Sequence, residues 1–147
     1  MTDKATGHCL CGAVRFEVHG PLRGVLICHC RECRRWGGHA FAATAAERGD
    51  LVVDGTTLTW VVSPESETGA RRGFCGACGS SLFWEAAESD SVSIAAGALD
   101  EPTGLRVIGH VFTSHAGDYY ELPDDGLPRF PRLTGVLPSI HDAGPPS

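Results

Sequence analysis

The sequence predicts a mostly β protein in which short strands surround clusters of metal-binding cysteines. Three observations support this fold class. Several short segments either alternate apolar and polar residues or form short apolar runs, which are the patterns of half-buried and buried strands. The 19 glycines and 9 prolines leave little room for long helices. The seven cysteines are many for a chain of 147 residues, and their spacings are typical of metal sites.

The predicted strands begin in the first third of the chain. Residues 13–18 alternate between apolar and charged side chains, so they predict a strand with one buried face. The apolar face comprises Val14, Phe16 and Val18. Residues 24–28 form an apolar run of strand length, and residues 40–44 fit either a strand or a helix. A helical turn is expected to begin near Glu32.

A β-hairpin is expected in the middle of the chain. Residues 51–53 and 58–62 have the composition of strands. Asp54 and Gly55 follow the first of them, and both tolerate the positive φ angles of a tight primed turn. Further strands are expected at residues 81–84, 92–96 and 105–113.

We expect one domain, because a chain of 147 residues suits a single hydrophobic core. This domain is placed at residues 1–130. From Leu122 onward the sequence is rich in proline and loses its periodicity, so residues 131–147 are predicted to form an extended and flexible C-terminal tail.

Charge and hydropathy indicate which classes of partner are unsuited to this chain and in which compartment it is expected. The net charge of −6 and the lack of a lysine-rich run argue against nucleic acid as a partner. No segment approaches the roughly 18 consecutive apolar residues of a membrane span, so no membrane partner is expected. The N-terminus lacks the pattern of a secretory signal, and a cytoplasmic location is therefore expected.

The cysteines favour a metal over disulfides. Disulfides need an oxidising compartment, and an odd number of cysteines leaves one thiol unpaired. In a Cys-x-Cys unit on an extended strand the two Cα atoms lie roughly 6.5–7 Å apart, at the limit of disulfide geometry. Two thiolates at tetrahedral angles around zinc tolerate this separation well.

Two motifs predict a closed site with four thiolates. A Cys-x-Cys unit precedes Gly12 and a Cys-x-x-Cys unit precedes Gly79, and each glycine permits a sharp turn behind the sulfurs. The predicted ligands are Cys9, Cys11, Cys75 and Cys78. A closed site of this kind is structural and contributes to folding. The alternative for the second unit is a redox dithiol, which would leave the first unit unexplained.

A third motif predicts an open site with three thiolates. On an extended segment Cys28 and Cys30 project to the same side, and Cys33 can fold back through a turn to the same ion. Three protein ligands and one open position are typical of a catalytic zinc. The alternative is a second closed site, completed by His29, His39 or a remote residue. His29 is expected to be a hydrogen-bonding neighbour, and His39 is a fourth ligand, a proton shuttle or an exposed loop residue.

Arginines flank two of the cysteine motifs. The third motif contains Arg31, Arg34 and Arg35, and Arg71 and Arg72 stand just before the Cys-x-x-Cys unit. Isolated arginines are usually solvated surface residues. Five arginines beside cysteine motifs favour a small anionic ligand instead.

This arrangement resembles the glutathione-dependent formaldehyde-activating enzyme family, which also includes centromere protein V. The resemblance rests on Cys-x-Cys-Gly before a strand, on Cys-His-Cys-Arg-x-Cys-Arg-Arg, and on Arg-Arg-Gly-Phe-Cys-x-x-Cys-Gly. Later landmarks at residues 97–100 and 125–130 extend the resemblance from Gly7 to Phe130.

The resemblance implies a Mss4-like fold, in which small sheets and few short helical turns are organised around zinc. It implies two zinc ions per chain. The structural ligands would be Cys9, Cys11, Cys75 and Cys78, and the catalytic ligands Cys28, Cys30 and Cys33. The implied activity is that of a carbon–sulfur lyase, whose reaction joins glutathione and formaldehyde as S-(hydroxymethyl)glutathione. Beyond the resemblance, we expect Arg31, Arg34 and Arg35, with Arg71 and Arg72 if the fold brings them near, to bind the carboxylates of such a thiol.

Two other functions are compatible with the motifs. One is a zinc-stabilised binding module without catalysis, and the other is a protein for thiol redox chemistry or zinc buffering. An exchangeable fourth position on the second zinc separates the enzyme from the binding module. Reversible disulfide formation within the third motif would favour the redox protein.

Overall fold

The computed structural model describes residues 4–64, 66–132 and 139–140, and it confirms a mostly β fold. The strands are β1 (Lys4–His8), β2 (Arg15–His19), β3 (Val25–Cys28), β4 (Phe41–Glu47), β5 (Leu51–Asp54), β6 (Leu58–Val62), β7 (Arg71–Cys75), β8 (Ser81–Glu85), β9 (Ser91–Ala95), β10 (Val107–Val111) and β11 (Arg129–Phe130). The helical elements are α1 (Arg31–Gly37) and the 3₁₀ turns η1 (Arg48–Asp50), η2 (Ala96–Ala98) and η3 (Thr113–His115). Among the described residues, no helix has both the length and the apolar character needed to cross a membrane.

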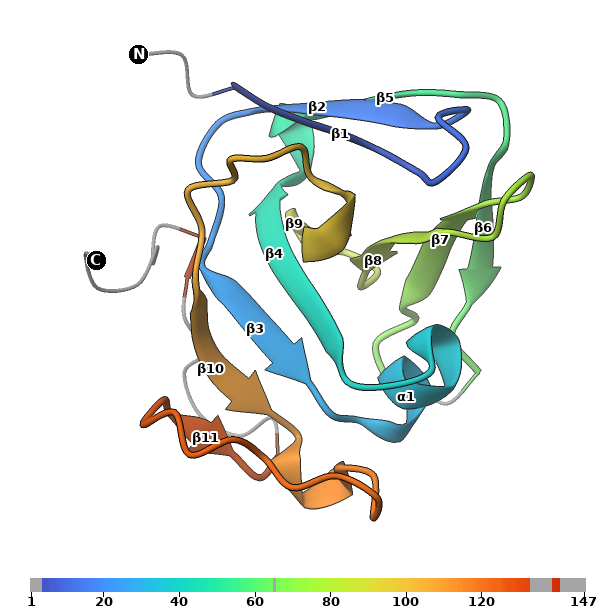
Figure 1. The fold of residues 1–147 in the computed structure, drawn as a ribbon. Coiled ribbons are helices and arrows are strands. Elements are labelled where there is room, and N and C mark those ends of the chain that lie inside the picture. The colour runs from blue at the N-terminus through green and yellow to red at the C-terminus, as the bar shows by residue number, and fades with distance from the viewer. Residues whose placement is uncertain (1–3, 65, 133–138, 141–147) are drawn as a thin grey trace.

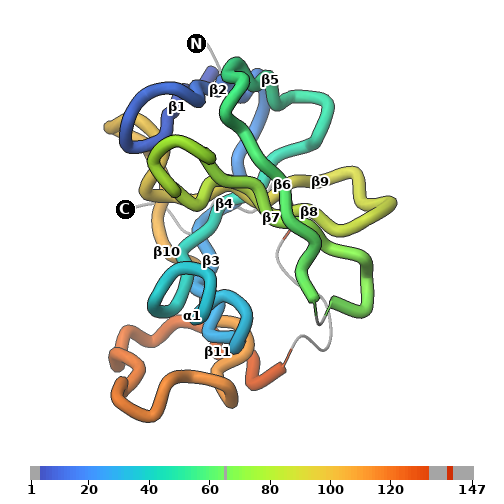
Figure 2. Tube along the Cα trace, turned by 90° about the vertical axis from the view of Figure 1, so that its right-hand side faces the viewer, coloured from blue at the N-terminus to red at the C-terminus, as the bar shows by residue number. Residues whose placement is uncertain are grey.

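The strands form two sheets (Figure 1). The smaller sheet has the order β1-β2-β5, and the larger has the order β11-β10-β3-β4-β9-β8-β7-β6. Strand β10 runs parallel to both β3 and β11, whereas the other pairs are antiparallel. Figure 1 and Figure 2 both show the small sheet at the top of the molecule and α1 in its lower half, with the segment around β11 below α1. The large sheet spans the distance between the small sheet and α1.

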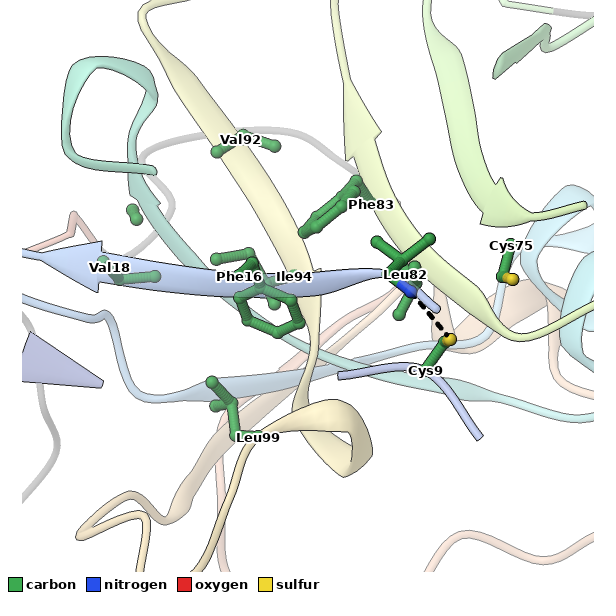
Figure 3. Close-up of a cluster of buried hydrophobic side chains, with 11 residues drawn as sticks. Cys9, Phe16, Val18, Cys75, Leu82, Phe83, Val92, Ile94 and Leu99 are labelled. Carbon is green, nitrogen blue, oxygen red and sulfur yellow. Dashed lines mark hydrogen bonds between the residues drawn. The ribbon is translucent and has the colours of Figure 1, made fainter. Parts of the chain in front are cut away.

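The main core lies between the small sheet and strands β8 and β9 (Figure 3). The apolar face predicted for residues 13–18 is buried there. Phe16 of this face contacts Phe83 of β8 edge to face, with ring centroids 5.3 Å apart. Cys9 and Cys75 belong to the same buried cluster, so the core extends as far as two of the predicted metal ligands.

Most of the predicted strands are confirmed. Strands β2, β3, β8, β9 and β10 overlap the expected segments, and residues 40–44 fall mainly in strand β4. Residues 43–46 of β4 are buried on both faces, and β4 lies inside the large sheet with β3 and β9 as its neighbours, which explains why its sequence does not alternate. Helix α1 begins one residue before Glu32. Strands β1, β7 and β11 were not predicted from the sequence.

The predicted hairpin at Asp54 and Gly55 is wrong. Strand β5 pairs with β2 in the small sheet, whereas β6 pairs with β7 in the large sheet. Pairing with β2 packs Leu51 and Val53 against the main core, and this burial outweighs the local turn preference. Gly55 has a φ of 145°, and a Cβ atom there would lie 2.5 Å from the carbonyl oxygen of Ala13. Gly55 therefore allows the backbone after β5 to pass close to the backbone at Ala13.

The C-terminal part of the domain prediction stays a prediction. Strand β11 places residues 129–130 in the large sheet. Most of the predicted tail, residues 131–147, lies outside the described residues.

Two valines on opposite faces of the small sheet test the assigned core. Val18 is fully buried, whereas Val52 is 56% exposed. We expect Val18→Ala to lower the free energy of unfolding by about 2 kcal/mol, because it removes two buried methyl groups and leaves a cavity. Val52→Ala is the matched control, with an expected change below about 0.5 kcal/mol. Chemical denaturation followed by tryptophan fluorescence measures both, and equal losses would contradict the assigned faces.

Candidate metal centres

Four cysteines from two distant turns meet beside the main core. Cys9 and Cys11 lie between β1 and β2, and Cys75 and Cys78 lie at the turn from β7 to β8. Their sulfur atoms all lie within 4.8 Å of one another. The sulfurs of Cys9 and Cys11 are 3.6 Å apart, and those of Cys11 and Cys75 are 3.9 Å apart. Tetrahedral zinc with sulfur bonds of about 2.3 Å requires sulfur separations of about 3.8 Å, so this donor set fits zinc.

The two turns that carry these cysteines are built alike. Gly12 donates its backbone N–H to the carbonyl oxygen of Cys9 at 3.1 Å, and Gly79 donates to that of Cys75 at 2.7 Å. The two glycines have φ angles of 80° and 82°, a region that other residues rarely adopt. The glycines therefore allow each turn to direct both of its sulfurs toward the same point.

Polar groups surround the sulfurs of this cluster. The contacts are Val14 N to Cys9 Sγ (3.3 Å), Thr57 Oγ1 to Cys75 Sγ (3.3 Å) and Ser80 Oγ to Cys78 Sγ (3.2 Å). The first of them is the dashed line in Figure 3. Donors in such positions stabilise the ionised form of a thiol, which is the form that binds a metal.

The surroundings of these thiols shift their pKa values in opposite directions. The side chain of Ser80 is the main group that lowers the pKa of Cys78, to about 5. A hydrogen bond from the backbone of Ala13 favours the thiolate of Cys11. Contacts with neighbouring sulfurs, first that of Cys9, outweigh it and raise the pKa of Cys11 to about 11. A positive ion among the sulfurs would therefore stabilise four thiolates at these distances.

A second cluster lies where β3 passes into α1. Cys28 ends β3, Cys30 is the N-cap of α1, and Cys33 is buried in its first turn. The three sulfurs lie within 4.8 Å of one another. The sulfur of Cys30 accepts the backbone N–H of Cys33 at 3.3 Å, which satisfies a donor at the start of the helix. Among the described residues the cluster contains three potential ligands, so a tetrahedral ion there would have one further position.

Contacts among the three thiols also limit ionisation in the second cluster. The pKa of Cys30 is lowered to about 2, first by the Cys28 thiol and then by the Cys33 thiol. The pKa of Cys28 is raised, first by the contact with Cys30 and then by that with Cys33. One sulfur therefore ionises easily while its neighbours hold their protons. A divalent cation would allow all three to ionise, so this donor set also suits zinc.

Neither nearby histidine lies in the sulfur cluster. His29 is buried on the other side of the segment from Cys28 and Cys30, and its Nε2 lies 3.1 Å from Nδ1 of His110. His39 is exposed, and its Nδ1 lies 2.7 Å from the hydroxyl of Tyr119. In the structure His29 is thus a hydrogen-bonded neighbour of the site, and His39 is a surface residue.

A chain of hydrogen bonds connects His29 to the surface. Nε2 of His110 lies 2.8 Å from a carboxylate oxygen of Asp125, and this bond lowers the pKa of Asp125. Because the carboxylate accepts from Nε2–H of His110, Nδ1 of His110 accepts from Nε2–H of His29. Burial lowers the pKa of His29, which favours its neutral form. Sequence reasoning missed His110, although a histidine in a buried apolar strand is a recognisable signal.

The three arginines of α1 have different environments. Arg31 and Arg35 are exposed and lie four residues apart, so they share one face of the helix. Arg34 is half-buried, and its Nε donates to the carbonyl oxygen of His115 at 3.0 Å. Two of the three arginines therefore face solvent next to the second cluster, and the third ties α1 to η3.

The other two arginines, Arg71 and Arg72, are neighbours in strand β7 but have different surroundings. Arg71 lies 2.6 Å from a carboxylate oxygen of Glu85 and stacks over the ring of Trp60, 4.0 Å from its centroid. Arg72 is buried, and its two terminal nitrogens lie 3.8 and 4.0 Å from the sulfur of Cys33. Arg72 therefore contacts the second cluster, although 39 residues separate it from Cys33.

Comparison with known proteins relates these clusters to a family. Residues 4–115 match the family described as glutathione-dependent formaldehyde-activating enzyme. A protein of Halomonas elongata, named "Putative glutathione-dependent formaldehyde-activating enzyme", is 36% identical over 83 residues, and the match covers 52% of this chain and 53% of that protein. The chain thus spans about half the length of this curated relative.

A solved structure shares the fold. The crystal structure of a Rhodobacter sphaeroides protein matches with a TM-score of 0.55 and 26% identity, over 84% of this chain and 98% of that one. The family match includes all seven cysteines and most of the residues that form the two sheets. The chain belongs to the glutathione-dependent formaldehyde-activating enzyme family.

Proposed function

We propose that this protein is a zinc-dependent carbon–sulfur lyase that joins a small thiol, such as glutathione, to formaldehyde and reverses that reaction. The observation that carries the proposal is the cluster of three sulfurs, to which the described residues add no fourth metal-binding side chain, separate from the cluster of four. Membership in the family supports the choice of glutathione and formaldehyde. None of the seven cysteines forms a disulfide, which suits a reducing compartment such as the cytoplasm.

The two clusters are assigned different roles. Cys9, Cys11, Cys75 and Cys78 would hold a structural zinc, because four protein ligands leave no position for a substrate. The catalytic zinc would be held by Cys28, Cys30 and Cys33. When bound there, zinc supplies a Lewis acid that lowers the pKa of a substrate thiol.

The proposed reaction needs no oxidant or reductant. The thiol sulfur forms a bond to the carbonyl carbon of formaldehyde, and the thiol proton ends on the carbonyl oxygen. The product carries an S-hydroxymethyl group, and the reverse reaction breaks the same carbon–sulfur bond. The task of the protein is therefore to hold the thiol close to the three-cysteine cluster in its ionised form.

Arg31 and Arg35 are the groups best placed to orient a glutathione-like thiol. Both are exposed, and Arg31 directly follows the N-cap residue Cys30. Glutathione carries two carboxylates, and guanidinium groups form charge-assisted hydrogen bonds with carboxylates. The bond from Arg34 to His115 favours a supporting role for Arg34, in holding the helix that presents the other two.

The open site is tested by Cys30→Ser. We expect this variant to lose about one of two zinc ions and all lyase activity, because a serine hydroxyl is a poor zinc ligand. The domain should stay folded, since the closed site is intact. Elemental analysis, circular dichroism and NMR detection of the S-hydroxymethyl product measure the three properties. Unchanged zinc content would mean that the three-cysteine site is misassigned.

The closed site is tested by the same substitution at Cys78. We expect Cys78→Ser to yield insoluble or unfolded protein, because the closed site joins two distant turns and contributes to folding. Soluble yield and the thermal unfolding midpoint are measured beside those of Cys30→Ser. A midpoint equal to that of the unchanged protein would argue against a structural role.

The arginines are tested by the double variant Arg31→Ala/Arg35→Ala. We expect the KM for glutathione to rise by about tenfold with kcat nearly unchanged, because exposed charge pairs add binding that is uniform along the reaction. Arg15→Ala, an exposed arginine of the small sheet, is the matched control. Cysteamine, which lacks carboxylates, should react equally well with both variants. An unchanged KM for glutathione would remove these arginines from the substrate site.

A further inference from the structure

Arg72 is a buried charge that needs an anionic partner. Its side chain is 6% exposed, and a guanidinium group is rarely buried unless its charge is compensated. Its Nε donates to the hydroxyl of Ser63 at 3.2 Å, and its charge lies 5.6 Å from the ring centroid of Trp36. Both partners are neutral. Within the parts of the chain that the structure describes, no carboxylate forms an ion pair with Arg72.

Of the groups in direct contact with Arg72, the sulfur of Cys33 is the one that can carry a negative charge. Both terminal nitrogens of Arg72 approach this sulfur, which is itself buried. The hydroxyl of Ser63 also donates to Glu32 Oε2 at 2.7 Å, so its lone pair is held toward Arg72. The guanidinium group is therefore fixed against the three-cysteine cluster.

The contact between Arg72 and Cys33 would offset part of the negative charge of a metal-loaded cluster. Three thiolates and one divalent ion carry a net charge of −1. A thiolate as the fourth ligand changes this net charge to −2. Such a charge is costly near a buried cysteine, where the effective dielectric constant is low. A neutral fourth ligand adds no charge. A fixed positive group beside the cluster thus favours an anionic fourth ligand over a neutral one.

We propose that Arg72 determines the ligand preference of the open position, by making a thiolate a better fourth ligand there than a neutral donor. The inference rests on the proposed function of the three-cysteine site and identifies the residue that would select thiols. Arg72 acts through Cys33 and is therefore a positioning residue.

The four-cysteine cluster has different surroundings from the three-cysteine cluster, and the difference supports the proposed role of Arg72. Its sulfurs receive a backbone N–H and two hydroxyl contacts. One of its cysteines, Cys11, is exposed, so water can screen its charge. The three-cysteine cluster, which has the proposed exchangeable position, is thus the one in which a buried guanidinium group, that of Arg72, lies against a buried sulfur, that of Cys33.

Ligand binding to the cobalt-loaded protein tests the proposal. Cobalt absorption bands change when a ligand enters an open position, whereas a closed four-thiolate site has none to offer. The full-length protein is titrated with 2-mercaptoethanol, which binds as a thiolate, and with imidazole, which is neutral. The variants are Arg72→Gln, which removes the charge, and Arg72→Lys, which keeps it. Arg71→Gln is the matched control, because Arg71 lies next to Arg72 but contacts Glu85.

We expect Arg72→Gln to weaken 2-mercaptoethanol binding by about tenfold and imidazole binding by less than about twofold. Arg72→Lys and Arg71→Gln should stay close to the unchanged protein.

Equal weakening of both ligands in Arg72→Gln, or no weakening of either, would overturn the proposal. So would a loss in Arg72→Lys as large as that in Arg72→Gln, since charge would then not be the cause. If the unchanged cobalt protein bound no thiol at all, the proposed function would fail, and this inference with it. Thiol binding that does not depend on Arg72 would leave the proposed function intact.

Discussion

Mutual repulsion among closely spaced sulfurs is the constraint on which the rest of the structure depends. The turn that carries Cys9 and Cys11 meets the turn that carries Cys75 and Cys78, so one cluster joins the small sheet to the large one. Two of these cysteines also belong to the main core. Thiolates at such distances destabilise one another unless a cation lies among them. Folding and metal binding are therefore expected to be linked in this protein.

The second cluster obeys the same electrostatic constraint with a different construction. Its three sulfurs come from a single short segment between β3 and α1, so their mutual placement needs little help from the rest of the fold. Its surroundings come from distant strands. Arg72 of β7 contacts the sulfur side, and His110 of β10 contacts His29 on the other side. The local segment sets the donor atoms, and the long-range partners set the charge around them.

The fold could be predicted where burial leaves a local pattern. Residues 13–18 alternate because one face of β2 is in the core, and the hydrophobic run of β3 reflects two consecutive buried residues, Val25 and Leu26, inside the large sheet. Strand β7 was missed because it contains glycine and two arginines, one of which is buried against a cysteine instead of facing water. The hairpin at Gly55 was wrong for a related reason: a turn preference is local, whereas strand partners are selected by the apolar surface that each pairing buries.

Residue spacing alone was enough to group the seven cysteines into four and three and to suggest the family. Over a few residues, chain direction and bond geometry dictate which side chains point the same way, and glycines mark where the chain must turn. Folding in three dimensions placed Arg72 against the sulfur of Cys33 and His110 against His29. Those neighbours come from strands 39 and 81 residues away along the chain, and their approach depends on sheet pairing and core packing, which no local pattern encodes.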